Sequence, residues 1–255
     1  MNITHIYYDE IDSTNNEIKR QIKNNIAEGT VISAGCQTAG RGRSGHDWVS
    51  PKGVSVATSM VLYPNSVKME HVPRLTLLAA VAVAKAIESL YDLKTEIKWP
   101  NDILVHKKKI CGILTEMEAE KGAVKYVVVG IGVNVHNREF EKELSDKATS
   151  LDLAIEEEGR SSYTHCKDVT KEIWDEFAKV YESFLQTEDL TEILSFYNER
   201  LVNKNKEVRV LDPLGAYEAI AIEMLSTGEL LVDKCGEKKK IDSGEVSVRG
   251  IYGYV

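Results

Sequence analysis

The chain has 255 residues, of which 43% are hydrophobic and 28% are charged, the composition of an ordinary soluble globular protein. This length accommodates one large domain, or one large and one small domain. The net charge of −8 argues against broad nucleic-acid binding, which favours a basic surface. A local basic site for a small anion remains compatible with this charge.

The four cysteines are far apart and include no Cys-x-x-Cys pair, and the six histidines show no His-x-x-x-His spacing. Neither a structural zinc site nor a disulfide framework is therefore indicated. Residues 1–12 lack the apolar stretch of a signal peptide, and the longest apolar run, 75–84, is too short to span a bilayer. We therefore expect a cytoplasmic protein.

The first half of the chain predicts strands and helices in alternation. Residues 1–11 predict a short strand, and Thr14 with Glu17 matches a capping box that would open the next helix. Residues 71–91 are apolar nearly all round, which predicts a buried helix. Further strands are expected at 31–36, 54–62, 96–105, 109–118 and 125–135.

The second half begins with a polar, acidic segment, 137–165, for which we expect an irregular crossover. Residues 168–186 predict an amphipathic helix that packs one stripe into the core. That stripe comprises Val169, Ile173, Trp174, Phe177, Val180, Tyr181 and Phe184. A second helix is expected over 190–202. Beyond residue 205, turn sequences separate four short β-like segments, at 207–211, 216–225, 230–235 and 246–252, which together suggest a small β-barrel.

The most distinctive stretch is residues 40–48, Gly-Arg-Gly-Arg-Ser-Gly-His-Asp-Trp. Arginine forks neutralise phosphates and carboxylates, and glycines let the backbone close over such groups. Trp48 offers a flat face to a base or fused ring. The stretch therefore predicts a lid over an anionic, nucleotide-like ligand, with a solvated basic loop as the alternative.

Gly40, Gly42 and Gly45 also satisfy G-x-G-x-x-G, the dinucleotide-binding signature. That signature requires a helix directly after the loop, whereas Pro51 and Gly53 predict a turn that leads into a strand. No acidic residue follows about twenty positions on in the right context. The sequence therefore argues against a Rossmann-type site.

Two further motifs lie at 98–102 with 109–116 (Lys-Trp-Pro-Asn-Asp and Lys-Ile-Cys-Gly-Ile-Leu-Thr-Glu) and at 130–134 (Gly-Ile-Gly-Val-Asn). With Gln-Thr-Ala-Gly-Arg-Gly-Arg at 37–43 they resemble the biotin protein ligase family, the biotin–[acetyl-CoA carboxylase] ligases. The segments at 13–15, 148–151 and 244–250 fall in the matching order. Each motif alone is weak to moderate evidence, but three long motifs in order are specific, and the resemblance runs from about residue 7 to the C-terminus.

The resemblance implies an α+β fold, with a mixed-sheet catalytic domain of the class II synthetase type at 1–203 and a small SH3-like β-barrel at 204–255. It implies an enzyme that activates biotin with ATP and Mg²⁺ to biotinyl-5′-AMP, and then passes biotin to one lysine of a biotin carboxyl carrier protein. Many relatives carry an N-terminal DNA-binding repressor domain, but this chain begins almost directly at the catalytic domain, so we expect no DNA binding. The family often dimerises through its central sheet, which leaves a homodimer open.

By resemblance, the biotin site comprises Ser13, Thr14, Asn15, Gln37, Gly40, Arg41, Gly42, Arg43, Lys109, Gly112 and Ile113. The nucleotide site comprises Arg43, Trp48, Asn101, Lys109 and Asn134, with Trp48 covering the adenine. Arg41, Arg43 and Lys109 would offset the repulsion between a carboxylate and the α-phosphate, with Mg²⁺ held largely by the phosphates rather than by protein ligands. Asp102 would act as a base or orienter for the acceptor lysine.

Each of these assignments has a structural alternative. Ser13 and Thr14 could simply cap a helix, and Lys109 could belong to a solvated lysine turn. Residues 101–102 could form only a turn pair, and the two glycines of 130–132 could merely permit close strand packing. Asn134 could be a strand-end cap. The chain also departs from the family at His46, where a third basic residue is common, and at Cys36, where an acidic residue is common.

Two rival functions remain open from the sequence. A lipoate or octanoate ligase shares the fold and the adenylation chemistry, although the Gly-Arg-Gly-Arg loop and Lys-Trp-Pro-Asn-Asp favour biotin. A non-catalytic biotin or nucleotide sensor is the second rival. The complete set of Arg41, Arg43 and Lys109 argues against a sensor, which has little use for so many phosphate-neutralising groups.

Overall fold

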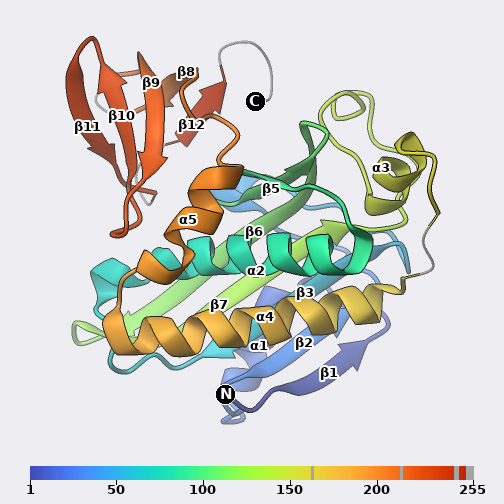
Figure 1. Ribbon diagram of the computed structural model, residues 1–255. Coiled ribbons are helices and arrows are strands. Elements are labelled where there is room, and N and C mark those ends of the chain that lie inside the picture. Colours follow the sequence, from blue (N-terminus) through green and yellow to red (C-terminus); the bar gives the residue numbers. More distant parts are fainter. Residues whose placement is uncertain (162–163, 213–214, 244–246, 251–255) are drawn as a thin grey trace.

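The computed structural model describes residues 1–161, 164–212, 215–243 and 247–250. Two β-sheets organise the chain (Figure 1). The larger sheet has seven strands in the order β1-β2-β3-β7-β6-β5-β4, and the smaller has five in the order β11-β10-β9-β8-β12. This is the α+β architecture with a mixed sheet that the sequence predicts, and the smaller sheet is consistent with an SH3-like domain.

The larger sheet is mixed because its first two strands are parallel and the other neighbours are antiparallel. A parallel pair needs a crossover, which helix α1 (Thr14–Ile22) provides between β1 and β2. The seven strands are β1 (Thr4–Tyr8), β2 (Thr30–Ala34), β3 (Ser55–Leu62), β4 (Glu96–Lys98), β5 (Asp102–Val105), β6 (Lys108–Glu120) and β7 (Ala123–Asn134).

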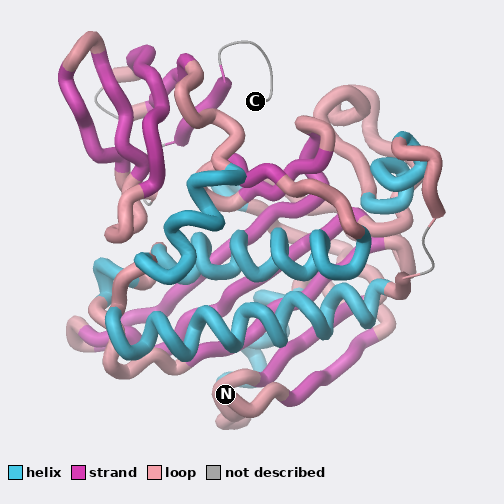
Figure 2. The backbone as a smooth tube through the Cα atoms, viewed as in Figure 1, coloured by secondary structure: helices cyan, strands magenta, loops and turns pink. Residues whose placement is uncertain are grey.

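Helices cover both faces of this sheet, so strand β3 is buried at every position. Helices α2 (Arg74–Tyr91) and α4 (Cys166–Thr187) lie side by side on one face, as Figures 1 and 2 show. Helix α1 packs against the other face, where Ile18 joins a second apolar cluster. The remaining helices are α3 (Leu151–Glu157) and α5 (Thr191–Arg200), with 3₁₀ turns at Arg43–Gly45 and Met69–His71.

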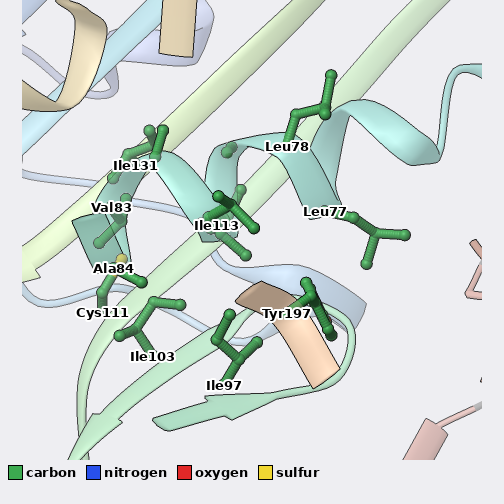
Figure 3. Packing of buried hydrophobic residues seen from close by; sticks show 14 of the residues in the cluster. Leu77, Leu78, Val83, Ala84, Ile97, Ile103, Cys111, Ile113, Ile131 and Tyr197 are labelled. Atoms are coloured by element: carbon green, nitrogen blue, oxygen red, sulfur yellow. The ribbon is translucent and has the colours of Figure 1, made fainter. Parts of the chain in front are cut away.

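The main core forms where α2 lies on the sheet. Leu78 and Ala84 of α2 pack near Ile113 and Ile131 of the central strands (Figure 3). The predicted stripe of α4 is buried in full, and α2 is buried nearly all round, as its composition predicts. None of the helices within the described part of the chain has the length and apolarity that crossing a membrane requires.

The smaller sheet contains β8 (Glu207–Leu211), β9 (Tyr217–Met224), β10 (Leu230–Lys234), β11 (Glu237–Ile241) and β12 (Ser247–Gly250). All its neighbouring strands are antiparallel. The sheet is joined to the rest of the molecule by Trp99, a 3% exposed side chain whose indole N–H donates to the carbonyl of Gly228 at 3.2 Å. The turn that carries Trp99, between β4 and β5, also contains Asn101, one of the predicted site residues.

Four sequence predictions are corrected by the structure. The expected strand at 96–105 is two strands, β4 and β5, which a turn at 99–101 separates. The crossover at 137–165 contains a short helix, α3, and the lysine-rich edge strand β11 was missed. The capping box is wrong as well: Ser13 is the N-cap but makes no side-chain cap bond, and the hydroxyl of Thr14 bonds elsewhere. Of the motif at 244–250, residues 244–246 lie outside the described residues.

Candidate active site

A pocket with about 450 Å³ of empty space lies between α1, the 37–48 loop and strands β6 and β7. The pocket brings together the predicted residues Ser13, Thr14, Asn15, Gln37, Arg41, Gly42, Arg43, Trp48, Asn101, Lys109, Gly112 and Ile113. Its lining also includes Leu114, Gly130, Ile131 and Gly132, whereas Gly40, Asp102 and Asn134 are not among the lining residues.

Uncharged polar groups form one end of the pocket. The side-chain oxygen of Gln37 accepts hydrogen bonds from the backbone N–H of Thr14 at 2.8 Å and from its hydroxyl at 3.1 Å. The side-chain N–H of Gln37 donates to Ser50 Oγ at 3.3 Å. Thr14 is buried, so these bonds fix the orientation of the Gln37 amide and leave a neutral, pre-organised donor and acceptor surface.

Asn15 extends this polar network along the wall of the pocket. Its Oδ1 lies 2.6 Å from Oγ of Ser59, and its Nδ2 donates to Oε2 of Glu116 at 2.8 Å. A Cβ at Gly130 would lie 2.1 Å from Oδ1 of Asn15, so only glycine allows the asparagine to approach strand β7. The glycine at 130 therefore accommodates a site residue, which close strand packing alone does not explain.

Glu116 is a site residue that the sequence analysis did not assign. Its carboxylate binds Lys19 Nζ at 2.7 Å and Arg41 Nη2 at 2.6 Å, in addition to Asn15. Burial acts to raise the pKa of Glu116, but the hydrogen bonds from Lys19 and Asn15 outweigh burial and lower that pKa. The only signal in the sequence was the place of Glu116 at the end of the 109–116 motif.

The indole of Trp48 packs on the glycine backbones of two neighbouring strands. Gly112 of β6 pairs with Gly132 of β7, and a Cβ at Gly132 would lie 2.3 Å from Cε2 of Trp48. The Nζ of Lys109 lies 5.8 Å from the centre of the ring, within reach of a cation–π contact. Within the described residues, the buried indole N–H has no hydrogen-bond partner.

Gly40 holds the other end of the same loop. Its carbonyl accepts the backbone N–H of Trp48 at 3.0 Å, and a Cβ at this position would lie 2.3 Å from the carbonyl oxygen of Trp48. The loop then continues into strand β3 rather than a helix. This geometry confirms that the glycine pattern at 40–45 is not a Rossmann signature.

Lys109 and Asp102 form an ion pair, with Nζ 2.6 Å from Oδ1. Asn101 donates to the same carboxylate oxygen at 3.1 Å and to the carbonyl of Ile113 at 3.3 Å. The backbone of Lys109 is held by the 147–149 segment, through hydrogen bonds of 2.8 and 3.0 Å. Lys109 is therefore an ordered strand residue, and the solvated turn lies before it.

Arg43 and Asn134 occupy the margins of the site. Burial lowers the pKa of Arg43, and the nearby charge of Asp102 acts in the opposite direction. The Arg43 guanidinium donates to the carbonyl of Ser243, close to the smaller sheet. Asn134 is buried at the end of β7, where its amide donates to the carbonyl of Thr149 at 3.2 Å.

Comparisons with known proteins show the family to which this chain belongs. Residues 7–134 match the model of the Biotin/lipoate A/B protein ligase family. The Bifunctional ligase/repressor BirA of Bacillus subtilis is 37% identical over 95% of this chain, which spans 73% of that relative. The Biotin–[acetyl-CoA-carboxylase] ligase of Mycobacterium tuberculosis is 35% identical over 50% of this chain and 47% of its own length.

A solved structure supports the same grouping over nearly the whole chain. The biotin protein ligase from Aquifex aeolicus in complex with biotin and ATP is 28% identical, with a TM-score of 0.81 over 97% of this chain and 99% of that chain. The chain therefore belongs to the biotin/lipoate A/B protein ligase family. Within that family, the Bacillus subtilis ligase/repressor and the Aquifex aeolicus biotin protein ligase each match at least 95% of this chain.

Proposed function

We propose that this biotin protein ligase works in two steps. The first joins biotin to ATP, giving biotinyl-5′-AMP and pyrophosphate. The second transfers the biotinyl group to a lysine of a biotin carboxyl carrier protein or domain and releases AMP. The observation that carries the proposal is one pocket whose lining combines the hydrogen-bonded neutral groups of Thr14 and Gln37 with the cations Arg41, Arg43 and Lys109.

In the first step, an oxygen of the biotin carboxylate forms a bond to the α-phosphorus of ATP, and the bond from that phosphorus to pyrophosphate breaks. Both reactants are anionic, so their approach needs positive charge that is already in place. Arg41, Arg43 and Lys109 are the cations of the described pocket lining. Lys109 would exchange its contact with Asp102 for one with phosphate.

The neutral end of the pocket suits the ureido ring of biotin. A ureido group has two N–H donors and one carbonyl acceptor and carries no charge, so it needs matched donors and acceptors in a buried place. Thr14, Gln37 and Ser13 line the pocket, and we assign the backbone groups of Gly112 and Ile113, which also line it, to the same ligand. The lipoyl and octanoyl groups of the rival substrates lack this ring and would leave those polar groups without partners.

The adenine would lie against Trp48, whose indole already rests on two glycines. Asn101 lines the pocket, and Asn134 would need to turn from Thr149 to reach the edge of the base. The unpartnered N–H of Trp48 would find an acceptor on a bound ligand. These three residues therefore remain our proposal for the nucleotide side of the site.

The second step needs a neutral acceptor amine. The lysine nitrogen of the carrier attacks the acyl carbon of biotinyl-5′-AMP, the bond to the phosphate oxygen breaks, and AMP leaves. Asp102 is the first residue of strand β5 and lies beside Lys109, and we assign it to accept the proton or to orient the amine.

We infer that Mg²⁺ enters with ATP. In the described part of the chain no group of three or more His, Cys, Asp or Glu side chains could hold a metal ion. A magnesium ion needs few protein ligands when phosphates supply its oxygens. Its contribution, when bound, would be to offset charge on the phosphates.

The absence of DNA binding, the oligomeric state and the cellular location also remain predictions. The net charge of −8 supports the absence of operator binding, and salt-sensitive binding of the purified protein to operator DNA would contradict it. A homodimer and a cytoplasmic location are open to direct measurement, by sedimentation and by cell fractionation.

The decisive experiment is acid-dependent ATP–pyrophosphate exchange with biotin, lipoate and octanoate in parallel. Exchange with biotin alone supports the first step. Exchange with lipoate or octanoate instead would assign the protein to the other branch of the family. Biotin binding without any exchange would favour a sensor.

A further inference from the structure

Glu116 contacts two residues of the pocket lining, Asn15 and Arg41, and the proposed reaction gives it no task. It projects from β6 and binds three groups from other parts of the chain: Asn15, Lys19 and Arg41. The Arg41 contact joins residues 75 positions apart and links the Gly-Arg-Gly-Arg loop to the sheet. The Lys19 and Asn15 contacts link the same carboxylate to helix α1.

We propose that Glu116 is a positioning residue, which holds Arg41 and with it the 40–48 loop over the pocket. Its bond to Arg41 is direct, at 2.6 Å; the carboxylate side chain is 21% exposed and the arginine side chain 41%, so water screens the pair in part. The part of this proposal that concerns substrate rests on the proposed function, whereas the holding of the loop does not.

The charges around Glu116 explain how it orders Arg41 without cancelling it. Lys19 and Arg41 are both cationic and contact different oxygens of one carboxylate, so the three groups together keep one positive charge. Without the carboxylate, the two cations would lack their shared counter-ion and would repel each other. The loop would then move away from α1, and Arg41 would leave the pocket rim.

Asn15 ties this cationic group to the neutral end of the pocket. Ser59 Oγ donates to Asn15 Oδ1 at 2.6 Å, the Thr14 hydroxyl lies 2.6 Å from Ser59 Oγ, and the backbone N–H of Thr14 donates to Gln37 at 2.8 Å. A continuous chain of hydrogen bonds therefore runs from Gln37 to Glu116. Removal of the Glu116 charge would loosen the loop first, and the Thr14–Gln37 end would retain its own bonds.

The test compares Glu116→Gln with Glu118→Gln, a matched control. Glu118 lies two positions further along β6 and binds Lys125 and Tyr126, away from the loop. Trypsin cleaves after arginine, so cleavage after Arg41 and Arg43 in the substrate-free protein reports on how firmly the loop is held. We expect Glu116→Gln to speed this cleavage about fivefold, the effect of losing a modest charged contact, and Glu118→Gln to leave it unchanged.

Kinetics provide a readout that a purely structural role would not move. In biotin-dependent ATP–pyrophosphate exchange, Glu116→Gln should raise the KM for biotin about fivefold and change kcat less than twofold, because the loop still closes once substrate is bound. An unchanged cleavage rate, or a lowered KM, would overturn the proposal; a lowered KM would mean that Glu116 restrains Arg41 from the substrate. Absence of exchange in the wild-type protein would count against the proposed function alone, since the cleavage comparison needs no substrate.

Two further variants keep the test decisive. If Glu116→Gln does not fold, Glu116→Asp retains the charge but is one methylene too short to reach Arg41, and it should also speed cleavage of the loop. Lys19→Met removes the other cation and leaves the Arg41 contact in place, so loop cleavage should stay at the wild-type rate. Wild-type cleavage in Glu116→Asp, or rapid loop cleavage in Lys19→Met, would contradict the assigned geometry.

Discussion

The Nζ of Lys109 lies 2.6 Å from Oδ1 of Asp102, so the residues that we assign to the two half-reactions share one ion pair. The aspartate is 14% exposed and the lysine 27%, and Asn101 donates to the same carboxylate oxygen. The ion pair therefore holds a lysine and a carboxylate next to each other. Substrate phosphate would compete with Asp102 for Lys109 and so free the carboxylate for the second step.

We expect Lys109→Ala to slow biotin-dependent ATP–pyrophosphate exchange by about two orders of magnitude, the loss typical of one preorganised electrostatic contact, about 3 kcal/mol. Arg41→Ala should have a similar effect. Lys108→Ala is the control, because Lys108 contacts only Glu157 among the described ion pairs and lies outside the pocket lining. Normal rates in both Lys109→Ala and Arg41→Ala would refute the site assignment.

Asp102→Asn should impair the second step more than the first. The amide keeps the size of the side chain but cannot accept a proton from the acceptor lysine, so transfer from preformed biotinyl-5′-AMP should fall at least about tenfold more than pyrophosphate exchange. The two half-reactions are measured separately, with a carrier domain as acceptor. Equal losses in both would mean that Asp102 acts only by positioning Lys109.

Gly132→Ala should move Trp48 out of its place. The new Cβ would lie 2.3 Å from the indole, and a loop side chain yields more easily than the backbone of strand β7. We expect the KM for ATP to rise about tenfold while the melting temperature changes little, because the conflict lies at the pocket and not in the core. Tryptophan fluorescence on addition of ATP reports the displacement directly. An unchanged KM would separate Trp48 from nucleotide binding.

Glu88 should make a pH-dependent contribution to stability. Burial acts to raise the pKa of Glu88, but hydrogen bonds from Arg200 and Thr95 outweigh it and hold that pKa below its ordinary value of 4.5. The folded protein therefore binds fewer protons there than the unfolded chain, so this stabilisation is complete above pH 4.5 and is lost as the pH falls through the folded pKa.

Glu88→Gln should accordingly lower the free energy of unfolding by about 1–2 kcal/mol near neutral pH, since it breaks a hydrogen-bonded pair between α2 and α5. The difference from the wild type should shrink in acid, as measured by urea denaturation over a pH series. Glu199→Gln is the control, because Glu199 is 69% exposed and lies 3.8 Å from the same arginine. A Glu88→Gln effect that is constant at all pH values would contradict this account.

The sequence predicted best those elements whose side chains repeat with a clear period. The apolar stripe of α4 and the long apolar run of α2 predicted two helices, and both bury the apolar side chains that we expected to be in the core. The failures fall where local pattern is weak. Strand β11 carries three lysines because it is an edge strand paired only with β10, and α3 is a helix of seven residues in an acidic segment.

The site was predicted as a set of motifs, and most of its members do meet in one pocket. The contacts of the polar site residues were harder to predict from the sequence. Thr14 looked like a helix cap, yet its hydroxyl bonds to Gln37, 23 positions away. Glu116 had no assigned role, since its partners come from α1 and from the 40–48 loop.

The sequence by itself determined the family resemblance, the mixed α+β class and the chemical types of the site residues, because these follow from local periodicity and from motifs in order along the chain. Only the tertiary structure decided that Trp48 rests on Gly132 and that Glu116 holds Arg41. Such contacts depend on the register of β6 against β7 and on the path of a loop above them. Both are set by packing between segments far apart in the sequence, which no local pattern encodes.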